Sequence, residues 1–363
     1  MNLKSHISNL RSYLLCATSV LLCASVVNFY PANTHASIVS SSTVATQDPT
    51  ILAAENFIKQ KNYTKAIETL ELSLSREPRS DPEAYVMLAT SRLNTGERDK
   101  AIEVCERGTT VHPKSERLAS FYVSLLQVAT TEDETKTKLE AKLEQNPTSI
   151  VYRKALGGLL LKQNPLNPQV AQLLATAAKL APRDAEARYL YGQWACLNNN
   201  EALCVAELNS ALALSSTNDL AQMQIHTLIG MAEDKLNRPA QAEAAFRSAM
   251  QFNRKLPQPN PHAAIQFVDF FIKRSRDAEA QRVVDEALKW SPDFGPARFE
   301  RAKFLAKQGK MEEAVREGRQ ALAYPHSNKI QLRAIHAFMA KTLFALGRTE
   351  EAQTHQSWIE SQP

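Results

Sequence analysis

Residues 62–78 read NYTKAIETLELSLSREP, and in this stretch Ala66 is followed twelve residues later by Pro78. The same spacing of alanine and proline returns in residues 97–113, ERDKAIEVCERGTTVHP, and in residues 277–292, DAEAQRVVDEALKWSP. A motif that recurs along a chain in this way is typical of a repeat architecture, in which one small structural unit is stacked many times.

The alanine of this motif is a landmark that can be followed along the chain. Successive landmarks lie 35, 34, 35, 34, 38, 38, 34 and 38 residues apart. A second column, whose members are no larger than valine, lies twelve positions before them. The landmarks are Ala66, Ala101, Thr135, Val170, Cys204, Ala242, Ala280, Ala314 and Ala352. The second column comprises Ala54, Ala89, Val123, Gly158, Gly192, Gly230, Val268, Ala302 and Ala340.

These two columns indicate that each repeat is a pair of antiparallel helices. Small residues allow two helix backbones to approach closely, and a large side chain would clash there. Gly96, Gly309 and Gly347 provide the positive φ that favours the end of a helix, and we expect them in the turn between the paired helices. Proline cannot continue a helix, so the prolines twelve residues after a landmark end the second helix. These prolines are Pro78, Pro113, Pro147, Pro182 and Pro292.

The pattern resembles the tetratricopeptide repeat, a 34-residue helix-turn-helix with small residues at both columns and a closing proline. The likeness covers about residues 50–360 and implies a right-handed, all-α solenoid of about nine repeats over residues 50–363. Residues 164–168 depart from it, because Pro165 and Pro168 are incompatible with the usual tight turn. The best-matched stretches are residues 66–78, 101–113, 230–249, 280–292 and 302–321.

Residues 1–36 have the layout of a secretory signal peptide. They carry Lys4 and Arg11, no acidic residue, and an apolar run too short for an ordinary membrane span. We expect cleavage after Ala36, with a retained N-terminal membrane anchor as the alternative. Both interpretations predict export of the remaining chain to the periplasm or outside the cell. Residues 37–49 are predicted to be a flexible, Ser/Thr-rich tether.

The exported part gives no indication of nucleic-acid binding, catalysis or a cofactor. Beyond residue 36 the chain has 41 basic and 38 acidic side chains, whereas phosphate binding requires clustered positive charge. Phosphate-binding glycine loops and the common hydrolase and metalloprotease motifs are not found. We therefore expect a protein without an enzymatic activity, although a catalytic site dispersed along the chain stays an alternative.

The histidines and cysteines favour packing over chemistry. His226 and His336 occupy the same slot, four residues before the second column, where bulky packing side chains are expected, so no metal site is predicted. Cys105 is expected to be a buried, inert thiol. Cys196 and Cys204 flank one turn, where they either form a disulfide or pack as small residues.

The resemblance implies that the first helices line a groove, through residues three before and one after the second column. Each of these residues either binds a partner or packs between helices, and the sequence leaves both roles open. The Lys, Asn and Arg set with which some relatives grip a C-terminal carboxylate is not present at these positions. The groove candidates are Tyr152, Tyr189, Gln193, Ile265, Asp269, Phe299, Lys303 and Lys341.

The sequence therefore favours an exported scaffold that holds protein partners in this groove, as an assembly factor of a cell-envelope complex. Membrane contact is expected only through an uncleaved N-terminal segment, and the oligomeric state is left open. The alternative is a polysaccharide- or polymer-binding accessory subunit, because Tyr152, Tyr189, Tyr191 and Trp194 fall near the middle of the array and aromatic rings stack on sugars.

Overall fold

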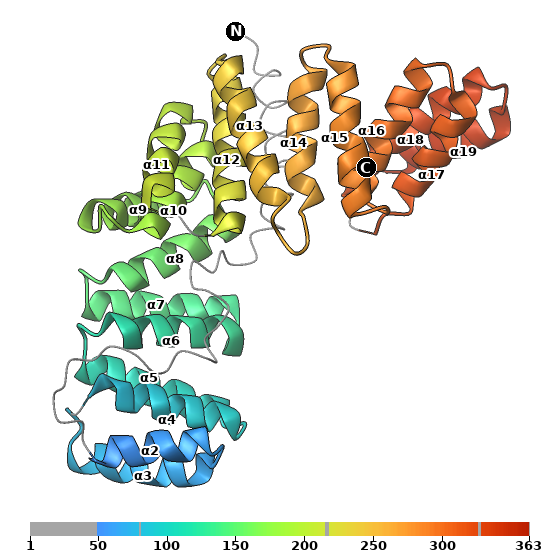
Figure 1. Cartoon of the computed structure of the whole chain (residues 1–363). Helices are drawn as coiled ribbons and strands as arrows, with labels where there is room; N and C mark the ends of the chain where they lie inside the picture. Colours follow the sequence, from blue (N-terminus) through green and yellow to red (C-terminus); the bar gives the residue numbers. More distant parts are fainter. Residues whose placement is uncertain (1–48, 80, 215–217, 326–327, 363) are drawn as a thin grey trace. The chain divides into compact units, whose positions relative to one another are not determined.

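The computed structural model describes residues 49–79, 81–214, 218–325 and 328–362. The described residues form 18 α-helices and no β-strand, arranged as nine consecutive pairs (Figure 1). The first helices of the pairs are α2 (Pro49–Lys59), α4 (Pro82–Asn94), α6 (Glu116–Ala129), α8 (Ile150–Gln163), α10 (Ala185–Leu197), α12 (Asp219–Lys235), α14 (Pro261–Ile272), α16 (Gly295–Lys307) and α18 (Lys329–Ala345). The second helices are α3 (Tyr63–Arg76), α5 (Arg98–Val111), α7 (Glu132–Gln145), α9 (Pro168–Leu180), α11 (Glu201–Leu214), α13 (Pro239–Asn253), α15 (Asp277–Trp290), α17 (Met311–Leu322) and α19 (Thr349–Ser361).

The prediction of an all-α solenoid of about nine helix pairs is thus confirmed in the part of the chain that the structure describes. The predicted signal segment, residues 1–36, lies outside the described residues, as does the predicted tether except for its last residue. That residue, Pro49, is the first residue of α2. Among the described helices, none combines the length and the apolar character that crossing a membrane requires.

The two columns of small residues lie where the helices of a pair meet. Every landmark lies in a second helix and is at most 4% exposed, including Thr135. The second column lies in the first helices and is also buried, apart from Gly158, which is partly exposed. These positions leave room for little more than a methyl or isopropyl group, which accounts for their restricted size.

Seven of the nine turns within the described pairs use positive backbone φ, as expected at Gly96, Gly309 and Gly347 (φ 82°, 79° and 75°). Four pairs place a residue other than glycine in the same conformation, and this was not foreseen from the sequence. Most L-residues avoid this region, although asparagine tolerates it better than others do. These residues are Lys61, Asn199, Asn237 and Ser275, each with φ of 56° or 57°.

The helix ends follow from local chemistry. The prolines at 78, 113, 147, 182 and 292 each lie two residues after a second helix ends, as predicted. Side-chain oxygens cap many helix starts by accepting from free backbone N–H groups, as Asp81 does for α4 and Ser115 for α6. The α13–α14 connection is closed by Asn253, whose buried amide exchanges two hydrogen bonds with the backbone of Asn260.

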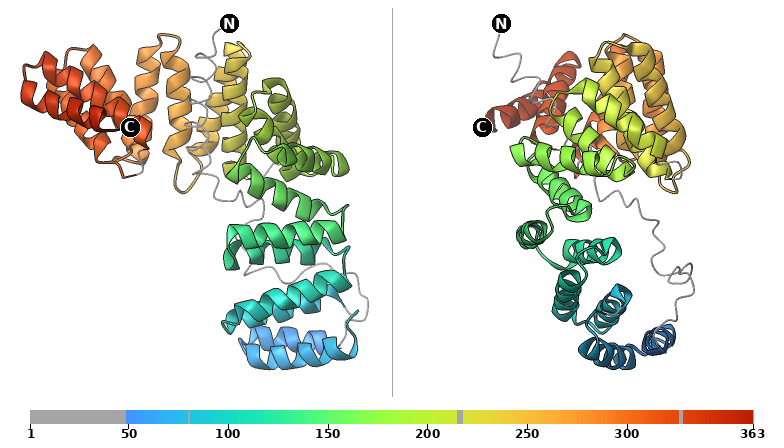
Figure 2. Two further views of the ribbon diagram at one scale, coloured as in Figure 1. Left: turned by 180° about the vertical axis from the view of Figure 1, so that it is seen from behind. Right: turned by 90° about the vertical axis from the view of Figure 1, so that its left-hand side faces the viewer.

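The described chain divides into two units with a boundary within α10, residues 49–194 and residues 195–362. Figure 2 shows that each of them consists of helices. In the second unit, the core is rich in phenylalanine. Phe246 of α13 lies 5.4 Å from Phe267 of α14, measured between ring centroids, and Phe267 lies 4.3 Å from Phe271. Such ring pairs add to the burial of apolar area and fix how neighbouring repeats pack.

Ion pairs connect neighbouring repeats at separations close to one repeat length. Arg276 reaches Glu243, 33 residues earlier, at 2.6 Å. Arg254 reaches Glu286, 32 residues later, also at 2.6 Å. Partly exposed pairs of this kind contribute on the order of 0–1 kcal/mol each, so we regard them as contacts that orient neighbours rather than as the main source of stability.

Gly158 and Gly230 occupy the same repeat position and provide a matched test of this packing. A Cβ atom at Gly230 would lie 2.9 Å from three ring atoms of Phe246, whereas at Gly158 it would make ordinary contacts of 3.7–3.8 Å with Leu190. Gly230→Ala is expected to lower the free energy of unfolding by about 1–3 kcal/mol through overpacking. Gly158→Ala is expected to raise it by about 0.5–1 kcal/mol, because alanine favours helix. Denaturant unfolding measures both, and effects of the same sign would contradict the assigned packing.

Candidate functional site

The predicted groove residues of the first unit are buried. Tyr152 in α8 is 3% exposed, and Tyr189 and Gln193 in α10 are 4% and 5% exposed. Burial raises the pKa of Tyr152 to about 12, while a hydrogen bond with Thr109 acts in the opposite direction, and burial also raises the pKa of Tyr189. Of the two roles that the sequence left open for these three side chains, their burial favours packing between helices over an open groove, because neighbouring helices enclose them.

The same finding weakens the sugar-stacking alternative. Of its four aromatic residues, Tyr152 and Tyr189 are buried and have no open ring face to offer. Tyr191 and Trp194 are partly exposed, and their rings stack on each other with centroids 5.7 Å apart and planes 10° apart. The described structure thus does not present the four rings together on a surface.

The second unit keeps its predicted groove residues at least partly accessible. Ile265 and Asp269 lie one turn apart on α14, as do Phe299 and Lys303 on α16, and all four are partly exposed. Lys341 of α18 is exposed. Helix α16 contacts both α14 and α18, so the structure brings residues of three successive first helices together.

Two further residues belong to this arrangement and were missed from the sequence. Phe338 of α18 packs edge-on against Phe299, with ring centroids 5.6 Å apart, and Glu300 lies beside Asp269 and Lys303. Both residues lie two positions before the second column. The groove positions that the resemblance implies lie three before and one after it. We call Ile265, Asp269, Phe299, Glu300, Lys303 and Phe338 the first-helix face.

The first-helix face combines aromatic and charged groups. Lys303 Nζ lies 4.9 Å from the centroid of the Phe299 ring and forms an ion pair with Glu300 Oε1. The other oxygen of Glu300 is buried and accepts no hydrogen bond from the described residues. Partly exposed rings beside hydrogen-bonding groups are typical of surfaces that contact another protein.

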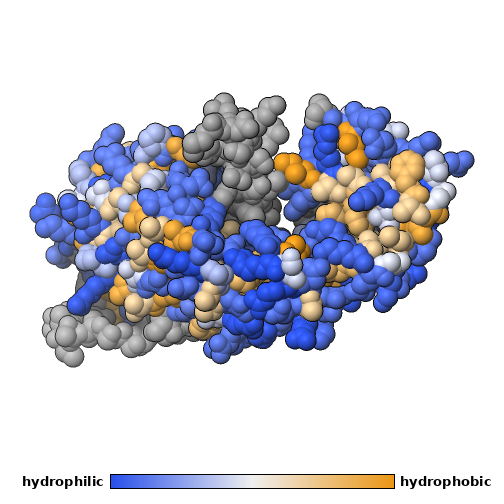
Figure 3. Space-filling model, turned by 90° about the horizontal axis from the view of Figure 1, so that it is seen from above, coloured by the Kyte–Doolittle hydropathy of each residue, from blue (hydrophilic) through white to orange (hydrophobic). Residues whose placement is uncertain are grey.

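Exposed apolar side chains also occur elsewhere on the protein. The face seen in Figure 3 mixes hydrophilic and hydrophobic residues. The large hydrophobic side chains that are well exposed are scattered over different helices, for example Leu52 on α2, Leu72 on α3 and Leu180 on α9. Singly exposed apolar residues of this kind are normal on a folded protein.

Burial has the largest effect on the pKa of Asp269. It raises the pKa of this carboxyl group from its ordinary value of 3.8 to about 6, and the neighbouring Glu300 carboxylate adds to the rise. Lys273 and Lys303 act in the opposite direction. Lys273 forms an ion pair with Asp234 and Lys303 one with Glu300, so neither lysine is committed to Asp269 alone.

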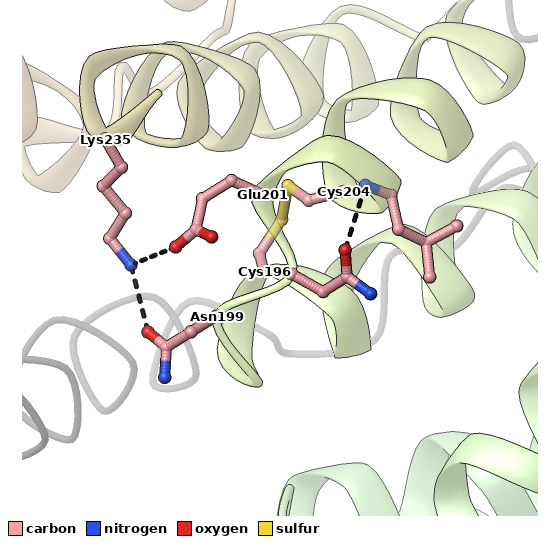
Figure 4. Close-up of a disulfide and its surroundings, with 7 residues drawn as sticks. Cys196, Asn199, Glu201, Cys204 and Lys235 are labelled. Carbon is pink, nitrogen blue, oxygen red and sulfur yellow. Dashed lines mark hydrogen bonds and ion pairs between the residues drawn. A yellow bond between two sulfur atoms is a disulfide. The ribbon is translucent and has the colours of Figure 1, made fainter. Parts of the chain in front are cut away.

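The structure joins Cys196 and Cys204, the pair that the sequence left open, in a disulfide with Cα atoms 5.0 Å apart (Figure 4). The bond closes the turn between α10 and α11. Lys235 of α12 contacts Asn199 in this turn and Glu201 at the start of α11. Its Nζ lies 3.3 Å from Asn199 Oδ1 and 3.0 Å from Glu201 Oε1. The disulfide therefore fixes a turn that also contacts the next repeat.

Cys105 is a buried free thiol whose pKa is raised to about 12 by burial, which agrees with an inert packing role. His226 stacks on Phe252 with ring centroids 5.6 Å apart, and burial lowers its pKa. In the described residues, no group of three or more His, Cys, Asp or Glu side chains is arranged as metal ligands.

The fold and the face define a class of protein, a solenoid of helix pairs with an accessible surface formed by its first helices. Tetratricopeptide-repeat family models match residues 57–125 and residues 271–328. With the nine described pairs, these matches identify the chain as a tetratricopeptide-repeat protein. Such repeats are in general scaffolds for protein interaction rather than catalysts.

Comparison with solved structures finds similar chains at low sequence identity. One is a chain in the crystal structure of the APC/C hetero-tetramer Cut9-Hcn1, with a TM-score of 0.49 and 14% identity. The match covers 88% of this chain and 61% of that chain, so this chain spans about three fifths of its length. Another is a tetratricopeptide repeat protein from Parabacteroides merdae ATCC 43184, with a TM-score of 0.41 and 14% identity. This match covers 67% of this chain and 92% of that chain. A comparison with curated proteins finds no match.

The disulfide generates a prediction about stability. Replacing both Cys196 and Cys204 with alanine is expected to lower the free energy of unfolding by about 2 kcal/mol, because the short loop between them is no longer closed in the unfolded chain. A reducing agent should lower the thermal midpoint of the wild-type protein and leave that of the double variant unchanged. Equal sensitivity of the two proteins to the reducing agent would contradict this role.

Asp269 generates a prediction about pH. Because its pKa is higher in the folded protein than its ordinary value, the folded state binds the proton more tightly, and stability is lost as the pH rises from about 4 to about 6. Asparagine cannot ionise, so Asp269→Asn should be more stable than wild type above pH 6, by about 3 kcal/mol. The difference should disappear near pH 4. Urea unfolding between pH 4 and pH 7.5 measures it, and a difference that does not depend on pH would disprove the assignment.

Proposed function

We propose that this protein is a non-enzymatic, exported scaffold that binds a protein partner on the first-helix face of its second unit and serves the assembly of a cell-envelope complex. The export part of the proposal is supported by the signal-like composition of residues 1–36. The binding part is supported by the tetratricopeptide repeats and by the first-helix face.

The observation that carries the proposal is the pairing of Phe299 with Phe338 across α16 and α18, next to Lys303 and Glu300. Both rings are only partly buried by the core around them. Completing the burial of an aromatic ring is among the strongest contributions to binding, and adjacent charged groups orient the partner. An extended segment or a helix of another protein would contact these groups together.

A polymer-binding function is less well supported, since two of the four aromatic residues on which it depends are buried. Catalysis would need reactive groups held in a fixed mutual geometry. The first-helix face offers one carboxyl group with a raised pKa, Asp269, beside the already paired Glu300, and the described residues around it contain no nucleophile paired with a base. The face is better suited to binding than to reaction.

Co-purification tests the proposal. The protein is expressed with its own N-terminal segment, crosslinked in intact cells and recovered, and its partners are quantified by mass spectrometry. Changing Phe299 and Phe338 to alanine should reduce recovery of the principal partner about tenfold or more, which corresponds to the loss of an aromatic anchor. Leu180→Ala, which removes a side chain 47% exposed on α9, is the matched control and should leave recovery unchanged.

Thermal unfolding of both variants establishes that the repeats remain folded. Equal recovery of partners by the wild type and a folded Phe299→Ala, Phe338→Ala protein would place the binding surface elsewhere. An absence of specific protein partners in the wild-type sample would contradict the scaffold function itself.

A further inference from the structure

The last helix pair holds a cluster of aromatic and imidazole rings that neither the fold nor the first-helix face uses. His336 of α18 and His355 of α19 face each other with their Nδ1 atoms 2.8 Å apart. The ring of Trp358 stacks on His336, with centroids 3.9 Å apart and planes 3° apart. All three side chains are partly exposed, so the cluster is accessible to water and to small ions.

The distance between the two nitrogen atoms is close to that between two adjacent nitrogen ligands on one metal ion. Imidazole nitrogen binds Zn²⁺ at about 2.0–2.1 Å, so two adjacent ligands at angles of about 90–109° lie about 2.9–3.4 Å apart. The observed 2.8 Å is only slightly shorter. As the rings stand, one neutral imidazole donates a single hydrogen bond to the other, and a small outward rotation would admit an ion in place of the shared proton.

Neighbouring side chains keep the two rings in position. Trp358 restrains His336 by stacking, and it follows His355 by three residues, so both project toward α18 from the same side of α19.

We propose that His336 and His355 bind one divalent transition-metal ion, Cu²⁺ in preference to Zn²⁺ or Ni²⁺, through their two Nδ1 atoms. Imidazole suits all three ions, and Cu²⁺ forms the strongest complexes with a given set of nitrogen ligands. Water completes the coordination. Glu351, one turn before His355 on α19, is paired with Arg319 and Arg348.

Bound metal would replace one hydrogen bond between α18 and α19 with two coordinate bonds. In α19 the buried residue is Ala352, which packs in one core cluster with Ile335, Met339 and Leu343 of α18. The ion would add to this contact and stabilise the last described pair. This role is independent of partner binding on the first-helix face.

Copper titration of the tag-free full-length protein tests the proposal. CuCl₂ quenches tryptophan fluorescence at short range, and Trp358 stacks directly on one proposed ligand. We expect saturable quenching with one ion per chain, which Trp358→Phe should abolish without abolishing copper binding. Electron paramagnetic resonance of the complex should show two nitrogen ligands.

His336→Gln and His355→Gln should each weaken copper binding at least tenfold, since even groups that only support a metal ligand contribute factors of 10–100. His226→Gln is the matched control, because His226 occupies the same repeat slot as His336 but stacks on Phe252 and should leave copper affinity unchanged. As a second measurement, ZnCl₂ should raise the thermal midpoint of the wild type and not that of His355→Gln. Wild-type affinity in either variant, or quenching that never saturates, would overturn the proposal.

Discussion

The structure depends on the close approach of two helices at small residues, repeated nine times in the described chain. Each second helix meets its partner at a landmark that is almost completely buried, such as Ala66 or Ala280. At Gly230 the constraint is strictest, because the Phe246 ring occupies the space that a β-carbon would need. The helices could not pair at this distance with larger residues, and without pairing no helix would bury its apolar side.

Contacts between repeats add specificity to this packing. A helix pair buries apolar area against the next pair, as the phenylalanine cluster around Phe267 and Phe271 shows. Charged pairs such as Arg276–Glu243 connect residues one repeat length apart. The turn closed by the Cys196–Cys204 disulfide receives Lys235 from the following helix. Nearest-neighbour contacts of this kind are how a solenoid maintains its order without long-range contacts.

Two groups of partly accessible, ionisable side chains are formed between helices of this array. On the first-helix face, Asp269 and Glu300 are brought together by α14 and α16, and burial raises the pKa of Asp269 to about 6. At the last pair, His336 meets His355 across α18 and α19. In both places the groups come from different helices, so their proximity is a product of stacking and not of local sequence.

The sequence by itself determined the helix pairs, their phase and their ends, because small residues, glycines and prolines act through local sterics that recur with each repeat. It also identified Ile265, Asp269, Phe299 and Lys303 as first-helix residues, but it left open whether these, and likewise Tyr152, Tyr189 and Gln193, line a groove or pack, and the last three are buried. Only the tertiary structure decided this, because the exposure of a side chain depends on which neighbours cover it. The contacts of Phe338 with Phe299, of Glu300 with Asp269 and of His355 with His336 were decided in the same way, since each joins two different helices.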